Sequence, residues 1–523
     1  MPDPQTAAAL RAALAAFEAG DLAAAEKLFR EVTARDPRQA ESWHVLALIA
    51  CRSGRAEEGL SFAQQAHALS RRDPEYLNTL GVACAELGKL DEAAQWLRRA
   101  LKQRPDYPDA HYNLGRVFTK LGQLGEAERS LRRAAVLAPQ RLDVVNNLGC
   151  VLEREGAVAE AQALFERALR ESPHDEAFAL NVGVALWGSL GADAAGEHYA
   201  RFLAQHPDSA LLHYVLALNL LARGRWREGW REYHWRRRLA GMRLPERPLD
   251  ALPADLSGKR VLLRREQGLG DELFFLRFAP QLRMRGASVG FECSPQLAGV
   301  LGAHPLLERI GEPDLALHVG DLPALLGSEE TPTPFPLEPD AGRIARWRER
   351  LAAAGPPPYI GITWRAGTAP ASQRDFVLRD VDALHKEMPL GLLAGAFEGV
   401  AGTVLLLQRH PGPDEAAAFA RLRRVPSLDL AGLNEDLAEM AAVLALIDDY
   451  VAVSNTNVHL RAGYGRSSRV VVPFPPEFRW MDSGDASPWF PGHRVYRQGA
   501  SRKWDDVLGL LARDLRARWG NAP

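Results

Sequence analysis

The chain has 523 residues, enough for roughly three folding units at about 100 to 200 residues each. Its 64 Lys and Arg are balanced by 66 Asp and Glu, which excludes a basic field that would hold a nucleic acid by counterion release. The four cysteines lie far apart and form no CxxC pair, so they predict neither a zinc site nor a disulfide framework.

The sequence contains no run of about 18 uncharged apolar residues, the length that a membrane-spanning helix needs. Acidic residues occur early in the amino-terminal segment, which is untypical of a secretion signal. We therefore expect a cytoplasmic protein.

The first part of the chain repeats itself every 34 residues. Prolines, Leu-Gly or Val-Gly pairs, single glycines and alanines recur in one register, except that the last single glycine is displaced by one residue: Pro105, Pro139, Pro173, Pro207; Gly81, Gly115, Gly149, Gly183; Gly88, Gly122, Gly156, Gly191; Ala93, Ala127, Ala161, Ala195. Small residues let paired helices approach closely, and proline ends the second helix of a pair. The pattern resembles the tetratricopeptide repeat and predicts an all-α superhelix of about seven units over residues 1–240.

Two details of the repeats carry further expectations. The second unit, which opens at Trp43, is expected to carry extra residues before Asp73-Pro74. Asn113, Asn147 and Asn181 recur at one position, where the first helix of each unit should line the concave face. They are candidate acceptor-binding residues whose amides would bond a peptide backbone, or residues common at that position in repeats of any function.

The last unit ends in the aromatic and arginine-rich segment 224–238, which we expect to seal the superhelix against the next domain. After a linker at residues 241–257, short β-rich runs alternate with helical segments, which predicts parallel α/β units. The predicted strands are 260–264, 288–293, 359–364, 403–408, 450–454 and 469–474. We expect two Rossmann-like lobes, an abbreviated one at 258–340 and a second at 358–523, joined by a linker helix within 341–357.

The turn after the first predicted strand contains Gly268, Gly270 and Asp271 at the head of a helix. Glycines there let the backbone approach a ligand, and a helix N-terminus offers unpaired N–H groups. The segment resembles the opening of the heptosyltransferase-like lobe of GT-B glycosyltransferases found behind bacterial tetratricopeptide arrays. The resemblance implies that Asp271 is the general base; the alternative is a helix-capping carboxylate, with Glu266 or Glu272 as the next bases to test.

The second lobe carries two further stretches that resemble the nucleotide-sugar donor site of that family, 359–376 and 448–498. In the second stretch a strand ends at Ser454 and a helix begins at Asn455, which is the geometry for a pyrophosphate at a helix N-terminus. The resemblance implies these donor-binding residues: Trp364, Arg365, Gly367, Arg374, Asn455, Thr456, Asn457 and His459. Asn455 stands where that family often has an acidic residue, so no acid role is expected there.

The Asp380-Val381-Asp382 triplet matches the metal-binding pair of single-lobe transferases, but its place at an expected helix start favours capping. We therefore predict no metal and no cofactor. The predicted function is that of an inverting, metal-independent glycosyltransferase, which moves a sugar from a nucleotide-sugar to a protein acceptor presented by the repeats. A glycan or lipopolysaccharide is the other acceptor class.

The architecture also resembles that of O-linked N-acetylglucosamine transferases, whose asparagine ladder gives the repeated asparagines a peptide-binding role. The alternative function is that of a repeat-based scaffold with an inactive transferase-like domain, because fold alone does not establish chemistry.

Overall fold

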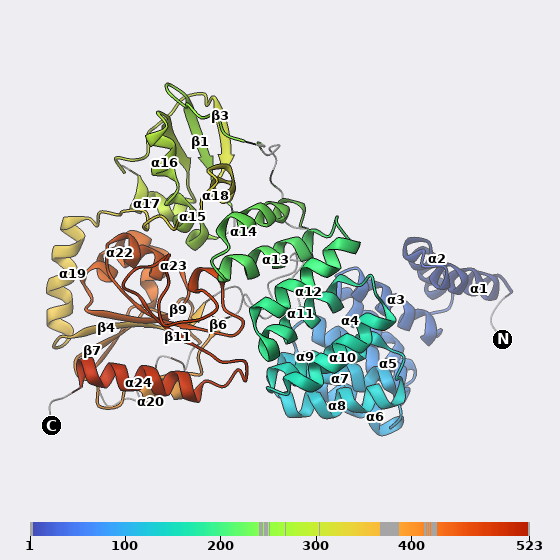
Figure 1. The fold of residues 1–523 in the computed structure, drawn as a ribbon. Helices are drawn as coiled ribbons and strands as arrows, with labels where there is room; N and C mark the ends of the chain where they lie inside the picture. Colours follow the sequence, from blue (N-terminus) through green and yellow to red (C-terminus); the bar gives the residue numbers. More distant parts are fainter. Residues whose placement is uncertain are drawn as a thin grey trace. The chain divides into compact units, whose positions relative to one another are not determined.

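The computed structural model of the protein describes residues 4–239, 244, 249, 251–266, 268–302, 304–366, 386–412, 415, 417, 419 and 426–520. The chain forms two compact units, Met1–Asn181 and Val182–Pro523. The first consists of helices, whereas the second joins the last repeat helices to two parallel sheets (Figure 1). No helix of the described residues is long and apolar enough to cross a bilayer.

The repeat superhelix begins with pairs of helices of nearly constant length. Its helices are α1 (Pro4–Glu18), α2 (Leu22–Arg35), α3 (Ala40–Arg52), α4 (Ala56–Leu69), α5 (Pro74–Glu86), α6 (Leu90–Gln103), α7 (Pro108–Lys120), α8 (Leu124–Leu137), α9 (Leu142–Arg154), α10 (Val158–Glu171) and α11 (Glu176–Leu190). Because α3 and α5 begin 34 residues apart like the later pairs, the second unit has the regular length. The expectation of extra residues before Asp73-Pro74 is wrong.

The recurrent glycines explain why the helices pack so closely. A Cβ atom on Gly81 would lie 2.6 Å from Leu97 Cγ, and one on Gly149 would lie 2.4 Å from the ring of Phe165. The glycines between the helices of a pair have positive φ, which L-residues rarely adopt. Gly191, one residue out of register, has φ 98° because α11 continues to Leu190.

First helices of successive pairs also contact each other: α3 with α5, α5 with α7, and α7 with α9. Such contacts place the first helices on the inner side of the superhelix.

The second unit starts with the remaining repeat helices and continues into the sheets. The helices are α12 (Ala192–Gln205), α13 (Ala210–Ala222) and α14 (Trp226–Tyr233), with a 3-10 helix at His234–Arg238. The small sheet has the order β2-β1-β3 and consists of β1 (Arg260–Arg264), β2 (Ser288–Glu292) and β3 (Leu315–His318). The large sheet has the order β11-β10-β9-β4-β7-β8.

All neighbours in the large sheet are parallel, so its described strands form one doubly wound sheet. They are β4 (Tyr359–Thr363), β7 (Thr403–Leu406), β8 (Ser427–Asp429), β9 (Asp449–Val453), β10 (Arg469–Val472) and β11 (Arg494–Arg497). The sequence pattern predicted β1, β2, β4, β7, β9 and β10 but not the short β3, β8 and β11. Strand order reverses between β4 and β9, which makes their carboxyl ends a topological switch point.

Alternate strand residues of the large sheet face two different helix layers. Ile362 and Val453 pack with α20 (Leu390–Ala396) and α24 (Asp505–Trp519), whereas Ala452 packs with α22 (Leu437–Leu446) and α23 (Thr456–Gly463). The sheet therefore lies between two layers of helices (Figure 1). The expected linker helix is α19 (Ala341–Ala354), which contacts α22.

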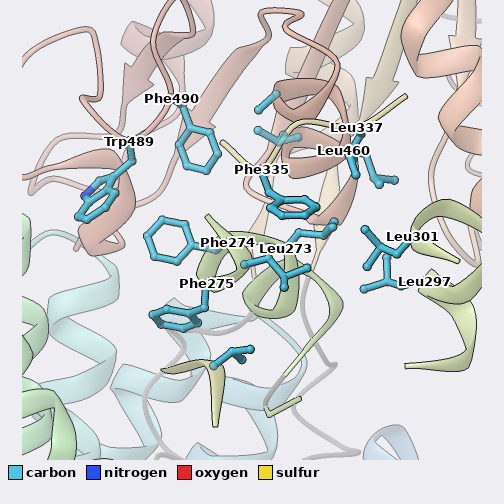
Figure 2. Packing of buried hydrophobic residues seen from close by; sticks show 14 of the residues in the cluster. Leu273, Phe274, Phe275, Leu297, Leu301, Phe335, Leu337, Leu460, Trp489 and Phe490 are labelled. Atoms are coloured by element: carbon cyan, nitrogen blue, oxygen red, sulfur yellow. The ribbon is translucent and has the colours of Figure 1, made fainter. Parts of the chain in front are cut away.

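The end of the repeats packs into the α/β part through aromatic side chains, as expected for segment 224–238. Trp230 of α14 is 2% exposed and meets Phe275, Phe478 and Trp489 edge-on, at ring-centroid distances of 6.1, 5.7 and 5.9 Å. Figure 2 shows the neighbouring Phe274 ring, from α15 (Leu269–Leu276), close to Phe275 and directed toward Trp489.

A buried ion network fixes the same junction. Arg236 donates to both carboxylate oxygens of Glu266, at 3.0 and 2.9 Å, and to Asp321 at 2.8 Å. The side chains of Arg236 and Glu266 are each 1% exposed. The last repeat and the small sheet are therefore held together by charges that water does not screen.

Candidate functional site

The candidate site lies where helices that follow strands of the two sheets meet. Helix α15 follows β1, α23 follows β9, and the two helices contact each other. A Cβ atom on Gly270 would lie 3.4 Å from the His459 ring and 3.8 Å from Thr456 Oγ1, so this glycine lets the two helix starts approach. Gly268 is the N-cap of α15, which makes Asp271 the third residue of the helix rather than its cap.

Asp271 has two partners at the start of α15. Its carboxylate accepts the Gly268 N–H at 3.3 Å and forms an ion pair with Arg479 from the 3-10 helix Phe478–Trp480. The Arg479 guanidinium lies 4.6 Å from the centre of the Phe274 ring. The predicted base is thus held by an arginine from the large-sheet part of the unit.

Lys386 is a site residue that the sequence analysis missed. It lies on the short β6 (Lys386–Glu387), its side chain is 13% exposed, and it forms an ion pair with Glu477. Its ammonium group also lies 3.4 Å from the carbonyl oxygen of Ser454, directly before α23. Burial, with the nearby positive charge of Arg479, lowers the pKa of Lys386 to about 8. A lone lysine in a polar segment gives no sequence signal of this kind.

Glu477 connects these groups. One of its oxygens accepts a hydrogen bond from Ser454 Oγ at 2.9 Å, and its carboxylate lies 3.7 Å from Arg479. Asp271, Arg479, Glu477 and Lys386 therefore form a continuous chain of alternating charges beside the start of α23.

The two alternative candidates for the general base have other partners. Glu266 is buried in the ion pair with Arg236. Glu272 is 1% exposed and accepts both the N–H and the hydroxyl of Ser294. Burial raises the pKa of Glu272. Both carboxylates thus already have polar partners of their own.

The predicted donor helix starts where the sequence pattern placed it, with Asn455 as the N-cap of α23. Its Oδ1 accepts the Val458 N–H at 3.1 Å, and its Nδ2 donates to the Tyr450 hydroxyl at 3.1 Å. An amide caps a helix as well as a carboxylate does, so Asn455 suffices to start α23.

The other predicted residues of this helix differ in accessibility. Thr456 opens α23, whereas Asn457 and His459 are each 6% exposed. The His459 ring meets the Phe490 ring edge-on at a centroid distance of 5.1 Å. Burial, together with Arg479, lowers the pKa of His459 far below its ordinary value, so its imidazole is neutral near pH 7. Its position favours packing between α15 and α23 over direct donor contact.

The structure also separates the predicted residues at the end of β4. Trp364 is 1% exposed and belongs to the apolar cluster between the large sheet and α20 and α24. Arg365 donates to Glu415 at 2.7 and 3.1 Å, so its charge already has a partner. Gly367 and Arg374 lie outside the described residues, as does the Asp380–Asp382 triplet.

The repeat helix α13 reaches the same region through Tyr214. Burial, with the nearby Asp271 carboxylate, raises the pKa of Tyr214 to about 12. Among the described residues no group of His, Cys, Asp and Glu side chains could hold a metal ion.

The repeated asparagines form hydrogen bonds between neighbouring first helices. Asn113 Nδ2 donates to Asn78 Oδ1 at 3.0 Å, and Asn181 Nδ2 donates to Asn146 Oδ1 at 2.6 Å. Asn147 Nδ2 donates to the Tyr112 hydroxyl at 3.3 Å and to the Asp143 carbonyl at 2.8 Å. The asparagine side chains thus join neighbouring first helices of the superhelix.

Comparisons with known proteins identify the first part of the chain. A family model described as the cilia and flagella-associated protein 70 C-terminal domain matches residues 2–138, and the tetratricopeptide repeat model matches residues 112–176 and 146–197. The amino-terminal region consists of tetratricopeptide repeats.

A curated relative extends the similarity beyond the repeats. Protein FlbA of Caulobacter vibrioides is 26% identical over 385 residues, which cover 66% of this chain and 61% of the relative. The repeats end before the middle of the chain, so an alignment of that length also includes part of the α/β region. The matched residues span about three fifths of the relative's length.

Solved structures of tetratricopeptide-repeat proteins are also similar to part of the chain. A tetratricopeptide protein of Thermus thermophilus, TTC0263, is 24% identical, with 35% of this chain and 98% of that chain covered and a TM-score of 0.32. PilW, a type IV pilus biogenesis factor, is 23% identical, with 41% and 100% covered and a TM-score of 0.38.

Proposed function

We propose that the second unit is an inverting, metal-independent glycosyltransferase that moves a sugar from a nucleotide-sugar to an acceptor presented by the repeats. The observation that carries this proposal is the meeting of Asp271, Arg479 and Lys386 beside the N-terminus of α23. These residues follow the carboxyl ends of strands in both sheets or lie next to them. Ligands of open parallel sheets bind at such ends.

Each of these side chains lies where it could carry out one part of the sugar transfer. Asp271 would accept the proton of the acceptor hydroxyl while the acceptor oxygen forms a bond to the anomeric carbon. The bond between that carbon and the phosphate oxygen would break, and its electron pair would leave with the nucleoside diphosphate. The Lys386 ammonium and the free N–H groups at the start of α23 would offset the charge of this leaving group. Phosphate would then replace Glu477 as the partner of Lys386.

Binding of a nucleoside diphosphate tests the proposal most directly. A thermal-shift screen of nucleotide-sugars should find one that raises the melting temperature, because a ligand that binds only the folded state stabilises it. Lys386→Met should then weaken binding of the matching nucleoside diphosphate by about 10- to 100-fold, the worth of a hydrogen bond to a charged group. Lys259→Met, which changes an exposed lysine of the same unit, is the matched control. Equal affinity of both variants for the nucleotide would contradict the assignment.

A scaffold function is the second candidate, and the surroundings of two predicted donor contacts favour it. Trp364 is packed in the core, and Arg365 is paired with Glu415. A protein that acts only through its repeats would not need Trp364 or Arg365 to contact a nucleotide-sugar. Purified protein that hydrolyses none of the nucleotide-sugars in the panel, and is stabilised by none of them, would support this candidate.

A further inference from the structure

A hollow of about 440 Å³ lies in the repeats between α4 and α6, within the first unit. Its floor consists of the buried side chains Leu80 and Cys84 from α5. The half-buried Leu60, His67 and Trp96 form part of the walls. The His67 ring meets Trp96 edge-on at a centroid distance of 5.2 Å. The volume falls within the range of roughly 300 to 1,000 Å³ that is usual for ligand sites.

The rim of this hollow is positively charged. Arg71, Lys89 and Arg99 line it against a single carboxylate, that of Glu92. Among the residues that the structure describes, none of these three cations forms an ion pair. Arg99 instead lies over the Trp96 ring, with its guanidinium carbon 4.3 Å from the ring centre. Burial and the charges of Arg99 and Arg71 lower the pKa of His67. Its neutral imidazole therefore adds no charge to the wall of the hollow.

The internal repeat shows that the fold does not require these residues. Arg71 stands where the other units have the proline that ends the second helix: Pro37, Pro105, Pro139, Pro173 and Pro207. One unit further on, the counterpart of Arg99 is Arg133, which forms an ion pair with Asp106. The counterpart of that aspartate is Arg72, so Arg99 has lost its partner and gained a further positive neighbour.

The residues that form the walls of the hollow also differ from their counterparts in the other units. The counterparts of Trp96 are Phe62, Ser130 and Leu164, and the residue one unit after His67 is Leu101. An aromatic wall, an apolar floor and unpaired arginines thus coincide at one junction between units. Unpaired guanidinium groups favour carboxylates, which they bind with two parallel hydrogen bonds.

We propose that this hollow binds an acidic peptide segment, with a carboxylate on Arg71 and Arg99 and an adjacent apolar side chain against Leu60 and Trp96. A bare inorganic anion would leave the apolar walls uncovered, and the balanced charge of the whole chain does not favour a nucleic acid. The site belongs to the first unit and does not rest on the proposed transferase activity.

Fluorescence polarisation with the full-length protein tests the proposal. The probe is a short fluorescein-labelled peptide in which Glu alternates with Leu, and the control probe carries Gln in place of Glu. We expect saturable binding of the acidic probe that weakens as salt rises from low to high concentration, and much weaker binding of the control probe. Absence of binding to the wild-type protein, or equal binding of both probes, would overturn the proposal.

The internal repeat also supplies variants that should fold. Arg71→Pro introduces the residue of the regular units, and Ser70 before it has φ −141° and ψ 87°, close to the φ −134° and ψ 90° of Arg104 before Pro105. Arg71→Pro and Arg99→Gln should each weaken binding by roughly five- to tenfold. Arg133→Gln, at the counterpart position with its own aspartate, should leave affinity unchanged. Wild-type affinity in both hollow variants, with unchanged helical circular dichroism, would refute the site.

Discussion

The first unit and the second unit use charge in opposite ways. In the repeats, arginines pair with carboxylates on the surface, as Arg132 does with Glu160 at 2.7 Å, with both side chains more than two-fifths exposed. In the second unit, Arg236 and Arg277 are buried, and Arg277 donates to the carbonyl oxygen of Trp489, 212 residues further on. The arginines of the repeats thus join neighbouring units at the surface, whereas buried arginines of the second unit join segments that are distant in sequence.

The largest expected effect tests whether chemistry is confined to the second unit. Asp271→Asn should lower sugar transfer by about 10²- to 10⁴-fold while nucleotide binding persists, because general-base assistance is worth that much. Asn at this position keeps the hydrogen-bond acceptor for the Gly268 N–H. Steady-state transfer rates and calorimetric donor affinity measure the two quantities, and a wild-type transfer rate would place the base elsewhere.

Removal of an arginine should destabilise the two units to different extents. Arg236→Met should destabilise the second unit by about 3 to 5 kcal/mol, because Glu266 and Asp321 would lose a buried partner. Arg132→Met, its exposed counterpart in the repeats, should cost about 1 kcal/mol or less. Denaturant titrations of both variants measure the difference. Adding Glu266→Gln to Arg236→Met should recover part of the loss; similar losses from Arg236→Met and Arg132→Met would remove the contrast.

Disruption of the close helix packing in the repeats should have the next largest effect on stability. Gly149→Ala should destabilise by about 1 to 3 kcal/mol, because its Cβ would lie 2.4 Å from Phe165. Gly125→Ala adds a Cβ with no atom nearer than 3.9 Å and should be neutral or stabilising by up to about 1 kcal/mol. Thermal unfolding followed by circular dichroism compares the two. A stabilising Gly149→Ala would mean that the pair of helices shifts at little cost.

The buried lysine predicts a pH dependence that the repeats should lack. With a pKa of about 8, Lys386 is mostly charged at pH 7 and mostly neutral at pH 9. Because phosphate binds the charged form, the affinity for a nucleoside diphosphate should fall about tenfold between these pH values. Lys386→Met should bind weakly at both, and an unchanged wild-type affinity at pH 9 would show that this lysine does not contact the nucleotide.

The smallest expected effect for each substituted residue concerns the asparagines between the repeat units. Changing Asn113, Asn147 and Asn181 to Ala removes hydrogen bonds worth about 0.5 to 1.5 kcal/mol each, so stability should fall modestly. Hydrolysis of free donor should be unaffected, while transfer to a protein should decrease if these side-chain amides hold the acceptor. Equal loss of hydrolysis and transfer would indicate a general structural role instead.

Local patterns were sufficient for much of the chain. The 34-residue period located the repeat helices because each unit contacts mainly its neighbours, and the apolar runs located the longer strands. The pattern also placed the start of α23 at Asn455, since an N-cap and a preceding apolar strand are both readable in sequence. Short strands such as β8 (Ser427–Asp429) carry no clear period and were missed.

Tertiary structure alone decided which polar residues meet. Glu266, Glu272 and Asp271 lie within seven residues, yet the first two are buried with Arg236 and Ser294 and the third pairs with Arg479, 208 residues away. Lys386 became a site residue only through its burial beside Glu477 and Ser454. The period of the sequence predicts helices and strands because it reflects local backbone geometry. The partner of a charged side chain depends instead on which distant segments pack together, and no local sequence pattern contains that information.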